Sequence, residues 1–591
     1  MNKPKTQLNK AANRKHFVFY IIAFLIPLIF VLAFEGTLRL IGFGKSHELF
    51  VANPANNAYL LATPNIMDRY FPFSQNKPSV SLETDFFLAN KPENGFRVVV
   101  QGGSSAAGFP YGLGASIAGT LEQRLRQSMP EHHVEVINTA MSAVNSFTLL
   151  DMADQIIAQQ PDMVLIYAGH NEFLGILGAS SNFSLANGYW LTRTKLYLKD
   201  FRTFQLFQWI YAQFERGNQT AVETDKNNFE KSRTMMAKVA QNQNIEYASP
   251  VYQAGLHQFE TNLNALLNKY AAANIPVLLS SIASNYQHQQ PLASLPIEAT
   301  NKQVLDNMQK QQTLSIKDYQ KISRKFTKSQ SANLHFQFAQ RALKANARDI
   351  ALMHFELAIQ HDLLKFRAPK EINSIINKLL ERDGVHFVDS FSLLSNRSPQ
   401  QIIGNSLMLE HLHPKLQAYY LISEAFYQQL KQVVIRHQPR ANWRDIAIEQ
   451  TWRQRLVLPS EEYNAYATIE NLTSHYPFVE NSKDLSLSKP TNKPQELGLA
   501  YFQKTITWLE MMEDNLAYYQ DTKNLTMVLK TTQILADALP HNGLYNIQAA
   551  EILAKLKENE LAIYYYKRAL RAGAVDGSIQ NKINNLATRK R

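Results

Sequence analysis

The feature that most constrains the fold is a short apolar strand that runs into a turn of small residues, RVVVQGGSSAAG at positions 97–108. Its three consecutive valines, 98–100, form a β-branched run that predicts a buried strand. A pair of glycines ends the strand, Ser104 follows, and residues 115–129 have a helical pattern. Because open α/β sheets carry their active sites at the carboxyl edge of the strands, we expect Ser104 at that edge.

This glycine–serine turn has three interpretations: a plain loop, a phosphate cradle or the site of a nucleophile. The two common phosphate-binding loops, GxxxxGK[ST] and GxGxxG, are absent. Two later segments favour the nucleophile. A second apolar strand at 161–167 runs into GHNE at positions 169–172, and EHLHP stands at positions 410–414.

The order of these three blocks resembles that of the SGNH (GDSL-like) hydrolase superfamily. Residues 102–108 lie over the block GDS(L)xxxG, residues 169–172 over GxND, and residues 410–413 over DxxH. The resemblance extends over about 97–285 and 385–432. It implies an α/β fold with a flavodoxin-like, three-layer parallel sheet, and it implies a serine hydrolase.

The resemblance also implies a role for each matched residue. Ser104 is the nucleophile, His413 is its general base, and Glu410 orients the imidazole. His413 is favoured over His411 because the following Pro414 matches the block. The remaining candidates are the oxyanion-hole groups, namely the N–H of Ser104, the N–H of Ala140 and the side-chain amide of Asn171, and the secondary residues Gly169, His170 and Asp389.

Three positions depart from the superfamily pattern. Gly103 stands in place of an aspartate, as in GGS-type members, Glu410 replaces the aspartate of the last block, and Ala140 replaces a glycine. The last two changes support an alternative function, a non-catalytic scaffold that recruits envelope proteins through helical repeats. Retention of the serine, the asparagine and the histidine of the three blocks favours an enzyme.

Composition excludes several other classes of protein. The chain has no cysteine, so disulfides, thiolate zinc sites and a cysteine nucleophile are excluded. Its net charge is +12, but no basic stripe with interleaved aromatic residues is visible, so no nucleic-acid partner is expected. HExxH and comparable ligand spacings are absent, so we expect neither a metal ion nor a cofactor.

The N-terminus carries a candidate membrane anchor. Eighteen residues without a charge, 17–34, follow five basic residues. The positive-inside rule places the tail 1–16 in the cytoplasm and the rest of the chain outside. We expect an uncleaved anchor over 17–43 in the inner membrane of the cell, with the bulk of the protein in the periplasm. A cleaved signal peptide is the alternative.

Alternation of strands and helices predicts a parallel sheet that is interrupted by helical segments. Residues 331–363 fit one tetratricopeptide unit loosely, where any amphipathic helix pair is an equal alternative, and residues 542–574 fit better. Residues 497–516 are predicted as one long helix. The predicted parts are a basic tail at 1–16, an anchor at 17–43, a linker or cap at 44–92, the first part of the α/β domain at 93–290, a helical insertion at 291–384, the second part of that domain at 385–436 and a helical region at 437–591.

The expected function follows from these parts. We expect a membrane-anchored extracytoplasmic serine enzyme that acts on an O-acyl ester, an acetyl ester, of an envelope glycan or lipid. The sequence does not separate an esterase from an acyltransferase, because the difference lies in which nucleophile reaches the acyl-enzyme. The helical repeats are expected to bind a protein partner.

Overall fold

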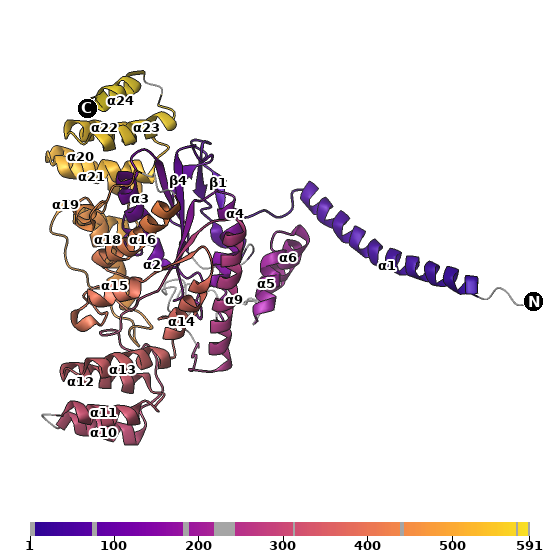
Figure 1. Ribbon diagram of the computed structural model, residues 1–591, viewed down its shortest axis with the longest axis horizontal. Helices are drawn as coiled ribbons and strands as arrows, with labels where there is room; N and C mark the ends of the chain where they lie inside the picture. The colour runs from indigo at the N-terminus through magenta and orange to yellow at the C-terminus, as the bar shows by residue number, and fades with distance from the viewer. Residues whose placement is uncertain are drawn as a thin grey trace, which may run out of the picture.

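A computed structural model describes residues 6–71, 73, 80–180, 188–217, 243–310, 314–437, 442–574 and 577–588 (Figure 1). Parts of the predicted cytoplasmic tail (1–5) and of the predicted cap (72 and 74–79) lie outside these residues.

A five-stranded parallel sheet forms the centre of the molecule, in the order β5-β4-β6-β7-β8. Numbered along the chain, this order is 2-1-3-4-5, that of flavodoxin-like sheets. The prediction of a parallel sheet is therefore confirmed. The strands are β4 (Gly95–Gly102), β5 (His133–Asn138), β6 (Met163–Tyr167), β7 (Val277–Ser280) and β8 (Val385–Val388).

The valines of β4 form the middle of the core. Val98, Val99 and Val100 have no exposed surface, and Val99 pairs with Ile137 on one side and Val164 on the other. A strand that is covered on both faces needs a continuous apolar run rather than alternation, which explains the triple valine. Helices cover both faces (Figure 1): α3 (Ile117–Ser128) packs with α16 (Leu416–His437), and α4 (Ser146–Ile157) packs with α9 (Pro250–Ala272).

A small antiparallel sheet precedes the central one in the chain, where a linker or cap is predicted. It consists of β1 (Phe50–Ala52), β2 (Tyr59–Ala62) and β3 (Phe86–Leu88). The buried Arg97 fixes it to the domain: one guanidinium nitrogen donates to Leu88 O at 2.7 Å and lies 2.7 Å from Glu135 Oε2.

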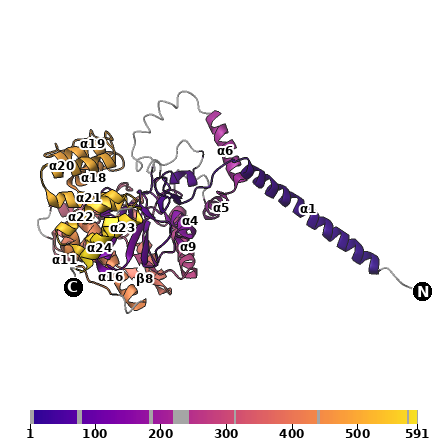
Figure 2. The same cartoon turned by 90° about the horizontal axis from the view of Figure 1, so that it is seen from above.

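The N-terminal helix α1 (Thr6–Leu40) projects away from the rest of the molecule in both views (Figures 1 and 2). Its segment Phe19–Leu40 is long and apolar enough to cross a membrane, and only 11% of that window is buried. The structure thus contains the predicted apolar helix, whereas its place in a membrane remains a prediction.

A helical insertion separates β7 from β8, as the sequence predicts. It consists of α10 (Ala299–Lys310), α11 (Ile316–Phe326), α12 (Ala332–Lys344), α13 (Arg348–His361) and α14 (Lys370–Lys378). Helices α12 and α13 pack together through the small and aromatic side chains of Ala339, Ala351, Phe355 and Ala358, which are all buried. This packing accounts for the helix pair, and its identity as a tetratricopeptide unit stays a prediction.

The C-terminal region is helical, as predicted. Its helices are α17 (Ile448–Arg453), α18 (Pro459–Thr473), α19 (Lys493–Phe502), α20 (Trp508–Asp521), α21 (Leu525–Ala538), α22 (Gly543–Lys555), α23 (Asn559–Arg571) and α24 (Gly577–Thr588). The single helix predicted over 497–516 is wrong. The chain turns after Phe502, and Thr507 begins α20 with a capping box that includes Glu510.

Candidate active site

Ser104 stands where the first strand of the domain ends. Strand β4 ends at Gly102, and the short helix α2 (Ser104–Ala107) begins two residues later. A Cβ atom on Gly102 would lie 2.2 Å from Tyr167 O, and one on Gly103 would lie 2.9 Å from the amide nitrogen of Asn171. The two glycines therefore let the serine turn approach β6 and the loop that carries Asn171.

Ser104, His413 and Glu410 form a hydrogen-bonded row. The Ser104 hydroxyl oxygen lies 2.7 Å from His413 Nε2, and His413 Nδ1 contacts Glu410 Oε1. The backbone N–H of His413 also donates to Glu410 Oε1, at 3.0 Å. With Nδ1–H donated to the carboxylate, Nε2 carries the lone pair that accepts the serine proton.

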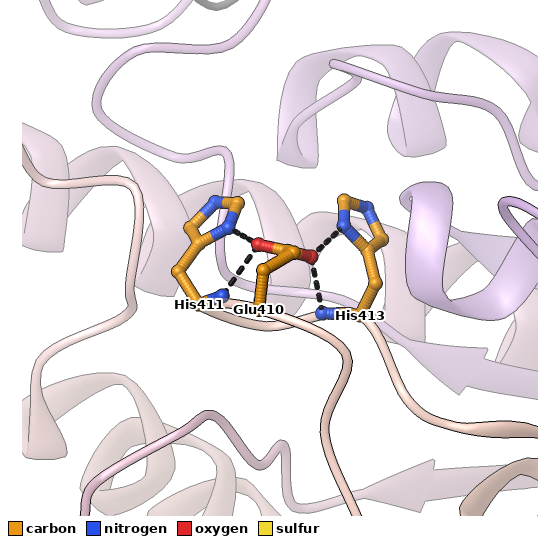
Figure 3. Close-up of side chains that lie close together, drawn as sticks. All are labelled: Glu410, His411 and His413. Atoms are coloured by element: carbon orange, nitrogen blue, oxygen red, sulfur yellow. Dashed lines mark hydrogen bonds and ion pairs between the residues drawn. The ribbon is translucent and has the colours of Figure 1, made fainter. Parts of the chain in front are cut away.

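Glu410 is shared between two histidines, as Figure 3 shows. One carboxylate oxygen contacts Nδ1 of His413, and the other contacts Nδ1 of His411. All three residues are buried. The ring of His411 packs edge-on against the rings of Phe366 and Phe478, with centroids 6.0 and 5.3 Å away. It is thus His413 whose Nε2 reaches the serine, while His411 lies on the other side of the carboxylate.

Burial sets the charge state of the histidines. Loss of water lowers the pKa of both His413 and His411. Both rings are therefore neutral near pH 7. A neutral His413 is the form that can take a proton from Ser104, and the adjacent carboxylate of Glu410 stabilises the imidazolium that results.

A cavity of about 390 Å³ opens at Ser104. Asn171 and His413 line it beside the serine, and much of the remaining wall is apolar. Three of the apolar side chains that line it are those of Leu174, Phe366 and Leu472. An acyl chain or acetyl group that enters this cavity would meet the nucleophile, the base and a side-chain amide together.

Ala140 is engaged elsewhere. Its N–H donates to the side-chain oxygen of Asn138 at 3.1 Å, and it is fully buried. Ala143 lines the cavity instead, with a positive φ of 62°. Ala143 belongs to the same loop as Ala140, but periodicity and composition do not reveal which residue of a loop lines a cavity.

The secondary candidates hold the surrounding loops together. His170 Nδ1 accepts from the Ala368 N–H at 3.2 Å, its Nε2 lies 3.2 Å from Ala283 O, and burial lowers its pKa to about 4. Gly169 has a φ of 149°, and a Cβ there would lie 2.6 Å from Ile372 Cγ2. Asp389 caps α15 (Ser390–Asn396) by accepting from the Ser392 N–H at 3.1 Å.

Glu410, His411 and His413 also lie close enough together to be considered as ligands of a metal ion. Ligand atoms of Glu410, His411 and His413 lie within 4.8 Å of one another. Both Nδ1 atoms, however, face carboxylate oxygens, and His413 Nε2 faces Ser104. The observed contacts join ring nitrogens to carboxylate and hydroxyl oxygens, as in a hydrogen-bonded row.

A second cavity of about 440 Å³ adjoins the first, since Glu83 and Phe109 line both. It lies between the α/β domain and the C-terminal helices, and burial raises the pKa of Asp85 to about 8 and those of Glu122 and Glu461 to about 7. The carboxyl groups that line it belong to Glu83, Asp85, Glu122, Glu461 and Asp537. Sequence analysis does not predict this cavity, because its walls come from distant segments.

Comparison with known proteins finds similarity among solved structures. The chain is 11% identical to a putative lipolytic protein of the G-D-S-L family from Desulfitobacterium hafniense DCB-2, with a TM-score of 0.25 and coverage of 56% of this chain and 98% of that one. It is 12% identical to a GDSL-like lipase from Bacteroides thetaiotaomicron VPI-5482, with a TM-score of 0.28 and coverage of 58% of this chain and 93% of that one. It is 13% identical to the psychrotrophic esterase EstA from a Pseudoalteromonas species, with a TM-score of 0.25 and coverage of 57% of this chain and 98% of that one.

No protein-family model and no curated protein matches the chain. With TM-scores this low, the fold assignment rests on the strand order of the sheet, and inferences about chemistry rest on the contacts around Ser104.

Proposed function

We propose that this protein is a membrane-anchored serine enzyme that cleaves or transfers an O-acyl group of an envelope glycan or lipid. The observation that carries the proposal is the row of side chains at the cavity. The Ser104 hydroxyl lies 2.7 Å from His413 Nε2, and Glu410 contacts the other ring nitrogen. A serine becomes a useful nucleophile when a base of this kind removes its proton during attack.

In the proposed reaction Ser104 Oγ attacks the ester carbonyl while its proton moves to His413 Nε2. The tetrahedral intermediate collapses as His413 returns the proton to the leaving alcohol, which yields an acyl-serine. Water or a second alcohol, deprotonated by His413, then attacks the acyl-serine and releases the acid or a new ester. Glu410 stabilises the imidazolium in both halves of the reaction.

The oxyanion of the intermediate needs hydrogen-bond donors. The side-chain amide of Asn171 and the N–H of Ser104 are proposed for this role, together with the N–H of Ala143 in place of that of Ala140. Each such donor contributes about 2.7–4 kcal/mol to stabilisation of the transition state.

The two adjoining cavities support a substrate with an apolar acyl group and a polar body. The cavity at Ser104 suits the acyl group, and the neighbouring carboxyl groups would exchange hydrogen bonds with sugar hydroxyls. This favours an acylated glycan over a simple lipid. The proposal includes both an esterase and a transferase, because the second cavity can hold either water or a sugar hydroxyl as the attacking group.

The test uses the purified full-length protein in detergent, with a fluorophosphonate probe and p-nitrophenyl acetate. We expect the wild type to be labelled and Ser104→Ala to lose both labelling and turnover. Ser105→Ala is the matched control, because its hydroxyl faces Leu412 O rather than His413. Labelling of Ser104→Ala, or a folded wild type that is never labelled, would contradict the proposal and favour the non-catalytic scaffold.

A further inference from the structure

A pair of helices between β6 and β7 carries exposed aromatic side chains. They are α5 (Tyr189–Leu198) and α6 (Arg202–Gly217). On α6, Phe207, Ile210, Tyr211 and Phe214 are 65%, 37%, 56% and 70% exposed. Their spacing of i, i+3, i+4 and i+7 places them on one face of the helix. We call these four residues the α6 stripe.

The neighbouring helix extends this exposed surface. Trp190 and Tyr197 of α5 are 79% and 76% exposed. Large aromatic side chains are normally the first to be buried, so a continuous apolar stripe beside two further exposed rings marks a surface with an external partner.

Side chains near the C-terminal end of α1 hold α6 in place. Glu35, near the end of α1, is buried and accepts hydrogen bonds from the N–H groups of Arg202 and Thr203 at 2.9 and 2.8 Å. It thereby satisfies two free N–H groups in the first turn of α6. Arg39, one turn further along α1, donates to Asp200 O at 3.1 Å.

Contacts beyond the end of α1 strengthen this attachment. The side-chain amide of Gln205 donates to Lys45 O at 2.8 Å and accepts from the Lys45 N–H at 3.0 Å. The rings of Phe43 and Trp209 meet edge-on with centroids 6.5 Å apart. Figure 2 shows α5 and α6 at the C-terminal end of α1, between that end and the catalytic domain.

We propose that α5 and α6 lie in the interfacial layer of the membrane that α1 crosses, with the α6 stripe facing the lipid. The inference rests on the membrane anchoring in the proposed function and goes beyond it. Tryptophan and tyrosine favour the headgroup region, and an amphipathic helix lies there with its apolar face about 5–10 Å into the headgroup–acyl boundary. The stripe lies next to the end of the spanning segment, so lipid is the surface that it meets first.

This arrangement fixes the catalytic domain relative to the membrane surface. Lys199, between α5 and α6, lies 2.7 Å from the carboxylate of Asp151 on α4. Asp151 also pairs with the buried Arg69, at 2.6 Å. The helix pair is thus tied to α1 on one side and to the catalytic domain on the other, which suits an enzyme whose substrate is attached to the membrane.

The absence of cysteine makes a direct test simple, because one introduced cysteine gives one labelled site. Tyr211→Cys in the full-length chain is labelled with a polarity-sensitive fluorophore and reconstituted in vesicles of phosphatidylethanolamine and phosphatidylglycerol. Emission is then measured with nitroxide-labelled lipid and with aqueous iodide. Phe207→Cys repeats the measurement at a second position of the stripe.

Two matched controls frame the result. Ile29→Cys, 61% exposed on α1, reports whether α1 lies in the lipid, and Leu544→Cys, 70% exposed on α22, reports an apolar position far along the chain. We expect nitroxide lipid to remove most of the emission at positions 29, 207 and 211 and little at 544, and iodide to do the reverse.

Three results would overturn the inference, and they are distinguishable. If the label at position 29 is in lipid but those at 207 and 211 are quenched by iodide, the anchor stands and the interfacial helix pair is wrong. If the labels at 207 and 211 are shielded from both quenchers, a protein surface covers the stripe. If position 29 is itself in water, the membrane anchoring in the proposed function fails as well.

Discussion

Two carboxylates, the buried Glu410 and the partly exposed Asp537, show how the partner of a carboxylate determines its role. Glu410 in the α/β domain contacts two neutral histidines, and one of them leads to a serine at a cavity. Asp537, on α21 of the C-terminal region, contacts Arg126 and Arg568 at 2.8 and 2.7 Å. An arginine keeps its charge at all working pH values, whereas a histidine can take and return a proton.

This difference between histidine and arginine partners predicts a catalytic role for Glu410 and a stabilising role for Asp537. Although burial opposes ionisation, the two arginines hold the pKa of Asp537 below its usual range. Because Arg126 belongs to α3 and Arg568 to α23, this ion cluster joins the two halves of the molecule. We therefore expect changes around Glu410 to affect turnover and changes around Asp537 to affect stability.

The largest expected effect is that of Ser104→Ala. Loss of the nucleophile should lower kcat by on the order of 10⁶-fold. Thermal unfolding should be almost unchanged, since the lost hydroxyl contacts only His413 among the contacts described for it. Steady-state kinetics with p-nitrophenyl acetate and a melting curve check the two halves of this expectation; a large drop in melting temperature would give Ser104 a structural role.

Glu410→Gln should have the next largest effect. An amide in this place no longer stabilises the imidazolium or fixes the tautomer of His413, and we expect a loss in kcat of about 10⁴-fold. Glu410→Asp keeps the charge and should retain far more activity than the glutamine variant. Equal activity of the two variants would show that the charge of Glu410 is not used.

Asp537→Ala tests the other side of the comparison. Removal of this carboxylate leaves Arg126 and Arg568 without their shared partner. Because Asp537 is partly exposed, we expect a loss near the lower end of the usual range, about 3 kcal/mol in the free energy of unfolding. Chemical denaturation measures it. With p-nitrophenyl acetate, which has no sugar to reach the second cavity that Asp537 lines, turnover per folded molecule should equal that of the wild type. A large drop in kcat with this substrate would contradict the separation.

Asn171→Ala should have a smaller effect on turnover. Its amide is one of several proposed oxyanion donors, and loss of one donor lowers kcat by about 10²–10³-fold with little change in KM. Asn138→Ala is the contrasting variant, because it releases the Ala140 N–H without touching the cavity. If Asn171→Ala raised only KM, the amide would bind substrate in the ground state instead.

The mildest test is the pH profile. Activity needs neutral His413, so kcat/KM falls as the pH drops through the pKa of this ring. Burial lowers that pKa below its usual value of 6.5, so the acid limb of the profile should lie below pH 6.5. A limb above pH 6.5 would mean that Glu410 outweighs the effect of burial. Kinetics from pH 4 to 8 on the wild type decide this.

Much of the fold could be predicted because it depends on local patterns. The apolar runs that became β4 and β6 are buried on both faces, so their sequences carry no polar interruptions. The order of strands and helices then limits the sheet to a few topologies. The break between Phe502 and Trp508 does not follow from the apolar pattern, because this pattern continues across it and only the Thr507 cap marks it.

Some features of the candidate site could likewise be predicted from the sequence, and others could not. The types and order of Ser104, Asn171, Glu410 and His413 are visible in the sequence, since the proposed chemistry needs those groups. The choice between Ala140 and Ala143 is not visible, because it depends on which residue of the folded loop lines the cavity. The exposed stripe of α6 also reads as an ordinary amphipathic helix until its surroundings are known.

The sequence by itself determined the parallel sheet and the apolar N-terminal helix, and it predicted the residue types proposed for the reaction, because each depends on residue types at short spacing. Only the tertiary structure decided how close the serine and the histidine come, which alanine of the loop lines the cavity and which helices meet the end of α1. These depend on contacts between segments as far apart as Ser104 and His413 or Glu35 and Thr203, and no local pattern records such contacts.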